Sequence, residues 1–126
     1  MRMRMLAFVA VLGAAACSNN SLYGGGGGGG GCTPTATQVC MNGSTFGPLN
    51  LTVAHGTTVT WMNGDGIAHT VTSATGSGDV YDSQNIAGGG TFNHTFATAG
   101  TYNYYCKIHG ANGTPPTGMH GTITVN

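Results

Sequence analysis

Four side chains in the C-terminal half of the chain could together bind one soft metal ion: His69, Cys106, His109 and Met119. Thiolate and thioether sulfur favour Cu(I), and imidazole suits copper in both of its common oxidation states. Two imidazoles and one thiolate in a trigonal array, with a weak axial methionine, are typical of copper sites that transfer electrons. The residue types therefore predict a single copper ion as the cofactor.

The strands that must position these ligands are indicated by alternation, because residues two apart share one face of a strand. Three series of this kind each contain one ligand: Ile67, His69 and Val71; Tyr102, Tyr104 and Cys106; Met119, Ile123 and Val125. We therefore expect these three ligands to face the core. His120 is expected to face solvent, and His94, between Phe92 and Phe96, to be a hydrogen-bonded core residue.

The composition of residues 32–126 favours strands over helices, because Thr, Gly, Asn and Val are frequent and Glu is absent. Turn signals such as Asn42-Gly43 separate short alternating segments. The expected strands are Thr37–Met41, Leu49–Ala54, Thr57–Asn63, Ala68–Ser73, Thr91–Ala97, Thr101–Cys106 and Gly121–Val125. About seven strands in one domain predict an all-β, two-sheet sandwich or flattened barrel.

Charged residues are scarce, and after the N-terminal segment only Lys107 opposes Asp65, Asp79 and Asp82. The formal net charge from Cys17 onward is −2. The chain lacks the basic stripe that would follow a phosphate backbone, so nucleic-acid binding is not expected.

Residues 1–16 have the layout of a secretory signal peptide, with a basic start, an apolar stretch and small residues before Cys17. The small residues followed by cysteine resemble the lipobox of bacterial lipoproteins, which implies lipidation of Cys17. The resemblance places the mature chain in the cell envelope, on the outer membrane facing the periplasm. The alternative is ordinary cleavage, with Cys17 unmodified.

Residues 17–31 are expected to form a flexible tether, because they end in eight consecutive glycines, Gly24–Gly31. A lipid on Cys17 would hold the following domain, residues 32–126, near a membrane without embedding it. Cys32 and Cys40 remain as a pair once Cys17 carries lipid and Cys106 binds metal. Export to an oxidising compartment favours a disulfide between them, the alternative being two free thiols.

Four ordered segments between Leu49 and Val125 closely resemble the cupredoxin family, and plastocyanin-like domains in particular. They are Thr57–Trp61, Ala68–Thr72, Gly100–His109 and Gly118–Val125. The resemblance implies a Greek-key β-sandwich of about seven or eight strands. It also implies that His69 comes from an upstream loop, and Cys106, His109 and Met119 from the loop before the last strand.

The chain departs from plastocyanin-like domains at two positions near the expected site. Nine residues, Gly110–Gly118, separate His109 from Met119, where such loops usually have fewer. Met119 is consequently the ligand that depends most on how this loop folds, and its alternative role is packing only. Thr70 follows His69 where plastocyanins often have Asn, so hydrogen bonding near the thiolate is expected to differ.

These features together predict an electron-transfer protein that cycles between Cu(II) and Cu(I), rather than an enzyme. Three strong donors and one weak axial donor leave no open position for a substrate. The expected partners are unidentified protein donors and acceptors of electrons, and the chain is expected to be a monomer. A copper-delivery module and a metal-free interaction domain on the same fold remain the alternatives.

Overall fold

Alternating apolar and polar side chains form eight strands in residues 31–126, the part of the chain that the computed structural model describes. In β4 every second side chain, from Val59 through Trp61 to Asn63, is buried. The strands are β1 (Gln38–Asn42), β2 (Thr45–Gly47), β3 (Asn50–Val53), β4 (Thr57–Asn63), β5 (Thr72–Ser73), β6 (Thr91–Phe96), β7 (Gly100–Ala111) and β8 (Thr117–Val125).

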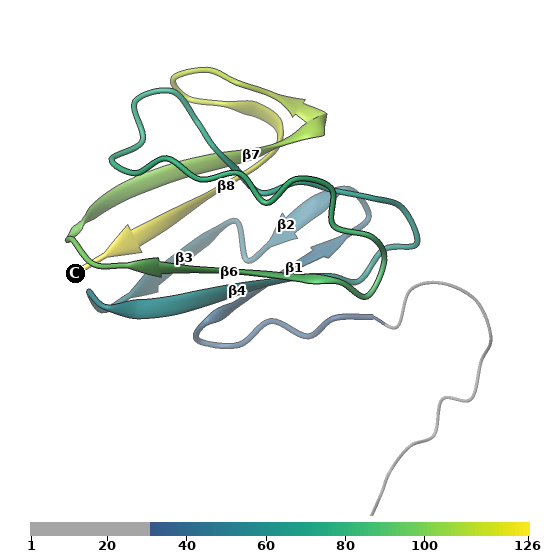
Figure 1. Cartoon of the computed structure of the whole chain (residues 1–126), viewed down its shortest axis with the longest axis horizontal. Helices are drawn as coiled ribbons and strands as arrows, with labels where there is room; N and C mark the ends of the chain where they lie inside the picture. Colours follow the sequence, from purple (N-terminus) through teal and green to yellow (C-terminus); the bar gives the residue numbers. More distant parts are fainter. Residues whose placement is uncertain (1–30) are drawn as a thin grey trace, which may run out of the picture.

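The strands form two four-stranded sheets, with the orders β2-β1-β4-β6 and β3-β8-β7-β5 (Figure 1). Most neighbours are antiparallel, but β1 runs parallel to β4, and β3 runs parallel to β8. The predicted all-β sandwich of two sheets is therefore confirmed. The long β7–β8 pair crosses the molecule, and its hairpin end lies far from the C-terminus (Figure 1).

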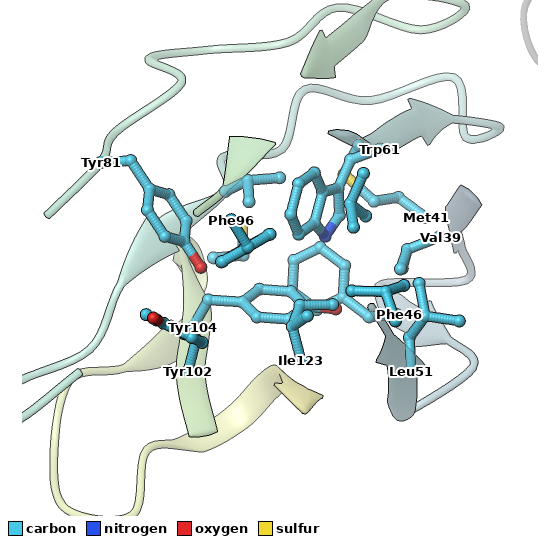
Figure 2. Close-up of a cluster of buried hydrophobic side chains, with 14 of the residues drawn as sticks. Val39, Met41, Phe46, Leu51, Trp61, Tyr81, Phe96, Tyr102, Tyr104 and Ile123 are labelled. Carbon is cyan, nitrogen blue, oxygen red and sulfur yellow. The ribbon is translucent and has the colours of Figure 1, made fainter. Parts of the chain in front are cut away.

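The core between the sheets is centred on Trp61 from β4 and Tyr104 from β7 (Figure 2). Their ring centroids are 5.3 Å apart and the rings meet at 83°, an edge-to-face geometry that aromatic pairs favour. The Phe46 ring from β2 packs against the Tyr104 ring, and their centroids are 4.8 Å apart. Tyr104 lies two residues before Cys106, so the packing that fixes this ring also fixes the strand that carries the thiol.

The structure differs from the sequence expectation in four elements. β2 was not predicted, because its three residues are too few to show a period. The expected strand Ala68–Ser73 is regular only at its end, in β5, and its first part is joined to Ile86 through one isolated bridge at His69. β7 and β8 both extend further toward their common loop than predicted.

Cys32 and Cys40 form the expected disulfide, with Cα atoms 5.5 Å apart, so the segment before β1 is joined to that strand. The predicted signal peptide (residues 1–16), Cys17 and all of the glycine-rich tether except Gly31 lie outside the described residues. Within the described part, no helix is long and apolar enough to cross a membrane.

Candidate metal centre

His69, Cys106 and His109 bring three metal-binding atoms together at one end of the sandwich. The Cys106 Sγ lies 3.9 Å from His69 Nδ1 and 3.7 Å from His109 Nδ1, and the two Nδ1 atoms are 3.1 Å apart. His69 and Cys106 are buried, whereas His109 is half-buried. Three donors that face a common point in this way match one mononuclear site.

His69 is held in place by the irregular ladder that replaces the expected strand. Its amide donates to the Ile86 carbonyl at 3.1 Å, and the Ile86 amide donates to the His69 carbonyl at 2.8 Å. Its ring is fully buried, as the alternation predicted. Ile67, assigned to the same face, is instead 52% exposed, because the alternation does not extend back into the loop before the ladder.

Thr70 joins the segment of His69 to the segment of Cys106. Its amide donates to the Cys106 Sγ at 3.3 Å, and its Oγ1 accepts a hydrogen bond from the Lys107 amide at 2.8 Å. An N–H donor stabilises negative charge on a thiolate sulfur, and the second bond fixes the distance between the two segments. Thr70 therefore supplies one hydrogen bond to the Cys106 sulfur and one between the two segments that carry His69 and Cys106.

The long loop before Met119 folds back as a continuation of the β7–β8 hairpin. Tyr105 pairs with His120, the next pair is Gly110 with Gly118, and four residues of β7 therefore lie opposite Met119 alone. Cys106 and His109 are the first and last of those four. Met119 is buried and belongs to the hydrophobic core, so it lies on the predicted face of β8.

Residues 106–109 of β7, opposite Met119 alone, form a β-bulge that we call the ligand bulge. Two glycines permit the close approach of β7 and β8 just beyond it. A Cβ at Gly110 would lie 2.6 Å from the Met119 carbonyl oxygen, and Gly118 adopts a positive φ of 69°. A larger residue at either position would force the strands apart or strain the backbone. The pairing of Gly110 with Gly118, and with it the position of Met119 opposite the ligand bulge, depends on both glycines.

Asp65 is a residue of the site that the sequence analysis missed. Its Oδ2 lies 2.7 Å from His69 Nε2, on the side of the imidazole away from Cys106. Burial by itself raises the pKa of Asp65, but hydrogen bonds from the Ser44 and Gly43 amides and from His69 outweigh burial, so its pKa is lowered. The signal in the sequence is a carboxylate four residues before a predicted ligand.

The other histidines lie outside the cluster. His94 is hydrogen-bonded, as expected, but its partner is Asp79, at 2.7 Å, and its side chain is 20% exposed rather than fully buried. His55 lies in an exposed turn. His120 directs its Nδ1 toward the Gly118 carbonyl at 2.8 Å and is half-buried rather than fully exposed to solvent.

The chemistry of the donors fits copper. Two imidazole nitrogens and one thiol sulfur converge on one point, two of the three residues are buried, and a thioether lies in the strand opposite. Hard cations such as Mg²⁺ prefer oxygen ligands, which this set does not supply, whereas thiolate and imidazole suit copper. The residues of a type 1 copper ligand set, His69, Cys106, His109 and Met119, are all present.

Comparison with known proteins agrees with this assignment. Residues 33–126 match the family model of copper binding proteins, plastocyanin/azurin family. Plastocyanin from Scenedesmus fuscus is 36% identical over 89 residues, which cover 64% of this chain and 85% of that protein. Halocyanin from Natronomonas pharaonis is 40% identical over 86 residues, which cover 67% of this chain and 50% of that protein.

A solved structure, that of a purple cupredoxin from Nitrosopumilus maritimus, resembles the fold described here. It is 33% identical to the chain and superposes with a TM-score of 0.59, covering 71% of this chain and 99% of that one. The family model spans most of the chain and includes all four ligand residues. The chain belongs to the plastocyanin/azurin family of copper-binding proteins.

Proposed function

We propose that the chain is a one-electron carrier that exchanges electrons with protein partners through a single type 1 copper ion. The observation that carries this proposal is the convergence of His69, Cys106 and His109, with all three donor atoms within 4.8 Å of one another. Copper bound there would supply the Cu(II)/Cu(I) couple. Its relatives plastocyanin and halocyanin are electron carriers and not enzymes, in agreement with this proposal.

Each ligand residue has a distinct role in the proposed carrier. A Cys106 thiolate would be the strongest donor to a bound copper ion and would give the main electronic path into β7, and His69 and His109 would each supply an imidazole nitrogen. We propose that Met119 would be the fourth and weakest ligand, supported by its burial and by its position opposite residues 106–109 of β7. A site held by the β7–β8 hairpin and by the backbone bonds between His69 and Ile86 would change its geometry little, which lowers the barrier to electron exchange.

The edge of His109 is the proposed route for electrons between the copper site and a partner. His109 is half-buried, whereas His69 and Cys106 are buried. Two half-exposed apolar residues, Ile67 and Ile108, lie within two positions of the ligand histidines and supply a modest apolar docking surface. Because few charges surround it, we expect docking to depend only weakly on salt.

The proposed location is the cell envelope, with a lipid on Cys17 as the membrane anchor. Support comes from the sequence alone: the basic and apolar leader, the small residues before Cys17 and the glycine run after it. Acylated chains hold proteins at a membrane through buried methylenes. Mass spectrometry of the exported chain tests this point, because lipidation adds the mass of acyl groups at Cys17 and Cys17→Ser abolishes it.

Reversible redox titration of the copper-loaded protein tests the proposed function. A carrier returns to its starting spectrum after reduction and reoxidation, keeps one copper per chain and fits a one-electron curve. Loss of copper on reduction, with transfer of the metal to a chelator, would contradict electron carriage and favour copper delivery.

A further inference from the structure

We propose that Asp65 positions His69 and sets the reduction potential of the copper site through a hydrogen bond to the outer nitrogen of the imidazole. The proposal rests on the function proposed above, because it assigns a residue that tunes the same site. His69 Nδ1 faces Cys106 and His109, and His69 Nε2 faces Asp65 Oδ2 at 2.7 Å. The two ring nitrogens therefore serve different partners.

The proton of the neutral imidazole must lie on Nε2 when Nδ1 binds metal. Asp65 accepts that hydrogen bond in an almost fully buried setting, because the His69 side chain is 0% exposed and that of Asp65 17% exposed. A carboxylate bonded to the outer nitrogen of a metal-binding histidine fixes the tautomer and the ring orientation and makes the imidazole a stronger donor. A stronger donor stabilises Cu(II) more than Cu(I).

Asp65 is itself held by the turn between β1 and β2, which carries no ligand. The Gly43 amide donates to Oδ1 at 2.7 Å, and the Ser44 amide donates to Oδ2 at 3.0 Å. Gly43 and Ser44 both have positive φ, at 60° and 55°, in the tight turn between β1 and β2. Consecutive amides that point to one concavity in this way bind anions, so this turn orients the carboxylate.

Asn63 fixes the backbone at the other side of Asp65. Its side chain is fully buried, accepts a hydrogen bond from the Asp65 amide at 2.9 Å and donates to the carbonyls of Ile67 and Ile86. Ile86 pairs with His69 through two backbone hydrogen bonds. Asn63 and Ile86 therefore connect the backbone of Asp65 to that of His69. Because both backbones are fixed in this way, the Asp65 carboxylate can hold the His69 imidazole in one orientation.

The same chain supplies a matched control. Asp79 lies 2.7 Å from the Nε2 of His94, the same separation as in the Asp65–His69 pair, but His94 is not a ligand. Asp79→Asn therefore removes one carboxylate charge beside a histidine without touching the copper site. Asp65→Asn removes the charge beside His69 and keeps a carbonyl oxygen that accepts a hydrogen bond.

The test compares the full-length chain with these two variants after copper loading. We expect Asp65→Asn to bind copper and to favour Cu(I) by about tenfold in a fixed redox buffer, which is 59 mV for a one-electron couple. Asp79→Asn should match the unmodified chain. An unchanged potential in Asp65→Asn, or the same shift in both variants, would overturn the proposal.

A measurement on the unmodified chain keeps the proposal testable if Asp65→Asn does not fold. Nitrogen-15 NMR of the diamagnetic Cu(I) form should show His69 protonated on Nε2, with that proton protected from exchange with solvent. A rapidly exchanging Nε2 proton would contradict the role of Asp65. Failure of the proposed function would look different, because the copper-loaded protein would then show no reversible couple at all.

Discussion

His69 and His109 offer the same donor atom to the cluster but lie in different surroundings. His69 is fully buried, is fixed by Ile86 on its backbone and meets Asp65 at its outer nitrogen. His109 is half-buried at the end of the ligand bulge. The first imidazole is therefore suited to setting the geometry of the site, and the second to contact with a partner.

Met119 is buried in β8 opposite the ligand residues of β7, so its replacement tests its role as a weak ligand. Met119→Leu should keep copper bound and keep the thiolate-to-copper absorption, because the three strong ligands remain. Its reduction potential should rise, since loss of the axial thioether removes a donor that helps to stabilise Cu(II). Voltammetry measures the shift, and Met62→Leu, a half-buried methionine of β4, is the control. Complete loss of copper binding would contradict a weak axial role.

The Thr70 hydroxyl should stabilise the fold, because it accepts a hydrogen bond from the Lys107 amide. Thr70→Val keeps the shape of the side chain but leaves the Lys107 amide without the acceptor that lies 2.8 Å away. We expect the metal-free protein to lose about 1–2 kcal/mol of unfolding free energy, measured by urea denaturation. Thr52→Val, at an exposed position of β3, should change it by less than about 0.5 kcal/mol. Equal stabilities of the two variants would show that the bond does not stabilise the fold.

At the scale of elements, the β7–β8 hairpin decides where Met119 lies. The sequence predicted both strands and the inward face of Cys106 and Met119, because alternation is a local signal. It could not predict that Gly110 pairs with Gly118, since that register depends on two strands meeting across a turn. Residues 110–118 alone do not predict where Met119 lies, whereas the pairing of Gly110 with Gly118 places it opposite the ligand bulge.

The tip of this hairpin yields a prediction about local opening. The Asn112 side chain accepts a hydrogen bond from the Thr75 amide and donates one to Thr75 Oγ1, both at 2.9 Å. Asn112→Ala should raise the rate of amide hydrogen exchange in residues 111–114 and 117, because the tip loses two of its three side-chain bonds to Thr75 and keeps only that from Thr114 Oγ1 to the Thr75 carbonyl, at 3.0 Å. The exposed Asn85→Ala is the control. Unchanged exchange in Asn112→Ala would mean that strand pairing and the Thr114 bond hold the tip without Asn112.

The contact between Asp65 and His69 likewise could not be predicted from the sequence. A carboxylate four residues before His69 is visible in the sequence. Its function depends on the turn between β1 and β2, whose amides orient it, and that turn is about twenty residues away in the chain. The ligands were found from residue type and spacing, whereas this contact arises only from the packing of segments distant in sequence.

Across the whole molecule, each aspartate of the described residues has a basic partner. Asp65 meets His69, Asp79 meets His94 and Asp82 meets Lys107. The hydrogen bond from His94 lowers the pKa of Asp79 despite the opposing effect of burial. Burial raises the pKa of Asp82, but the bonds from Lys107 and the Gln84 amide outweigh it, and its pKa is lowered too.

These lowered pKa values predict a loss of stability in acid. A carboxyl group with a lower pKa in the folded state stabilises the fold above its unfolded pKa, near 3.8 for these residues. That contribution is lost as the pH falls through the folded pKa, so the urea midpoint of the metal-free protein should drop between pH 5 and about pH 3. Asp79→Asn should show a smaller drop. A midpoint that is constant over this range would contradict the linkage.

Whether Cys106 builds a type 1 copper site can be measured by adding Cu(II) to residues 32–126 and recording visible and electron paramagnetic resonance spectra. We expect an intense thiolate-to-copper absorption band at one copper per chain, with a single mononuclear copper signal, and the disappearance of the band in Cys106→Ser. Absence of the band in the unmodified chain, or its persistence in Cys106→Ser, would show that Cys106 does not form such a site.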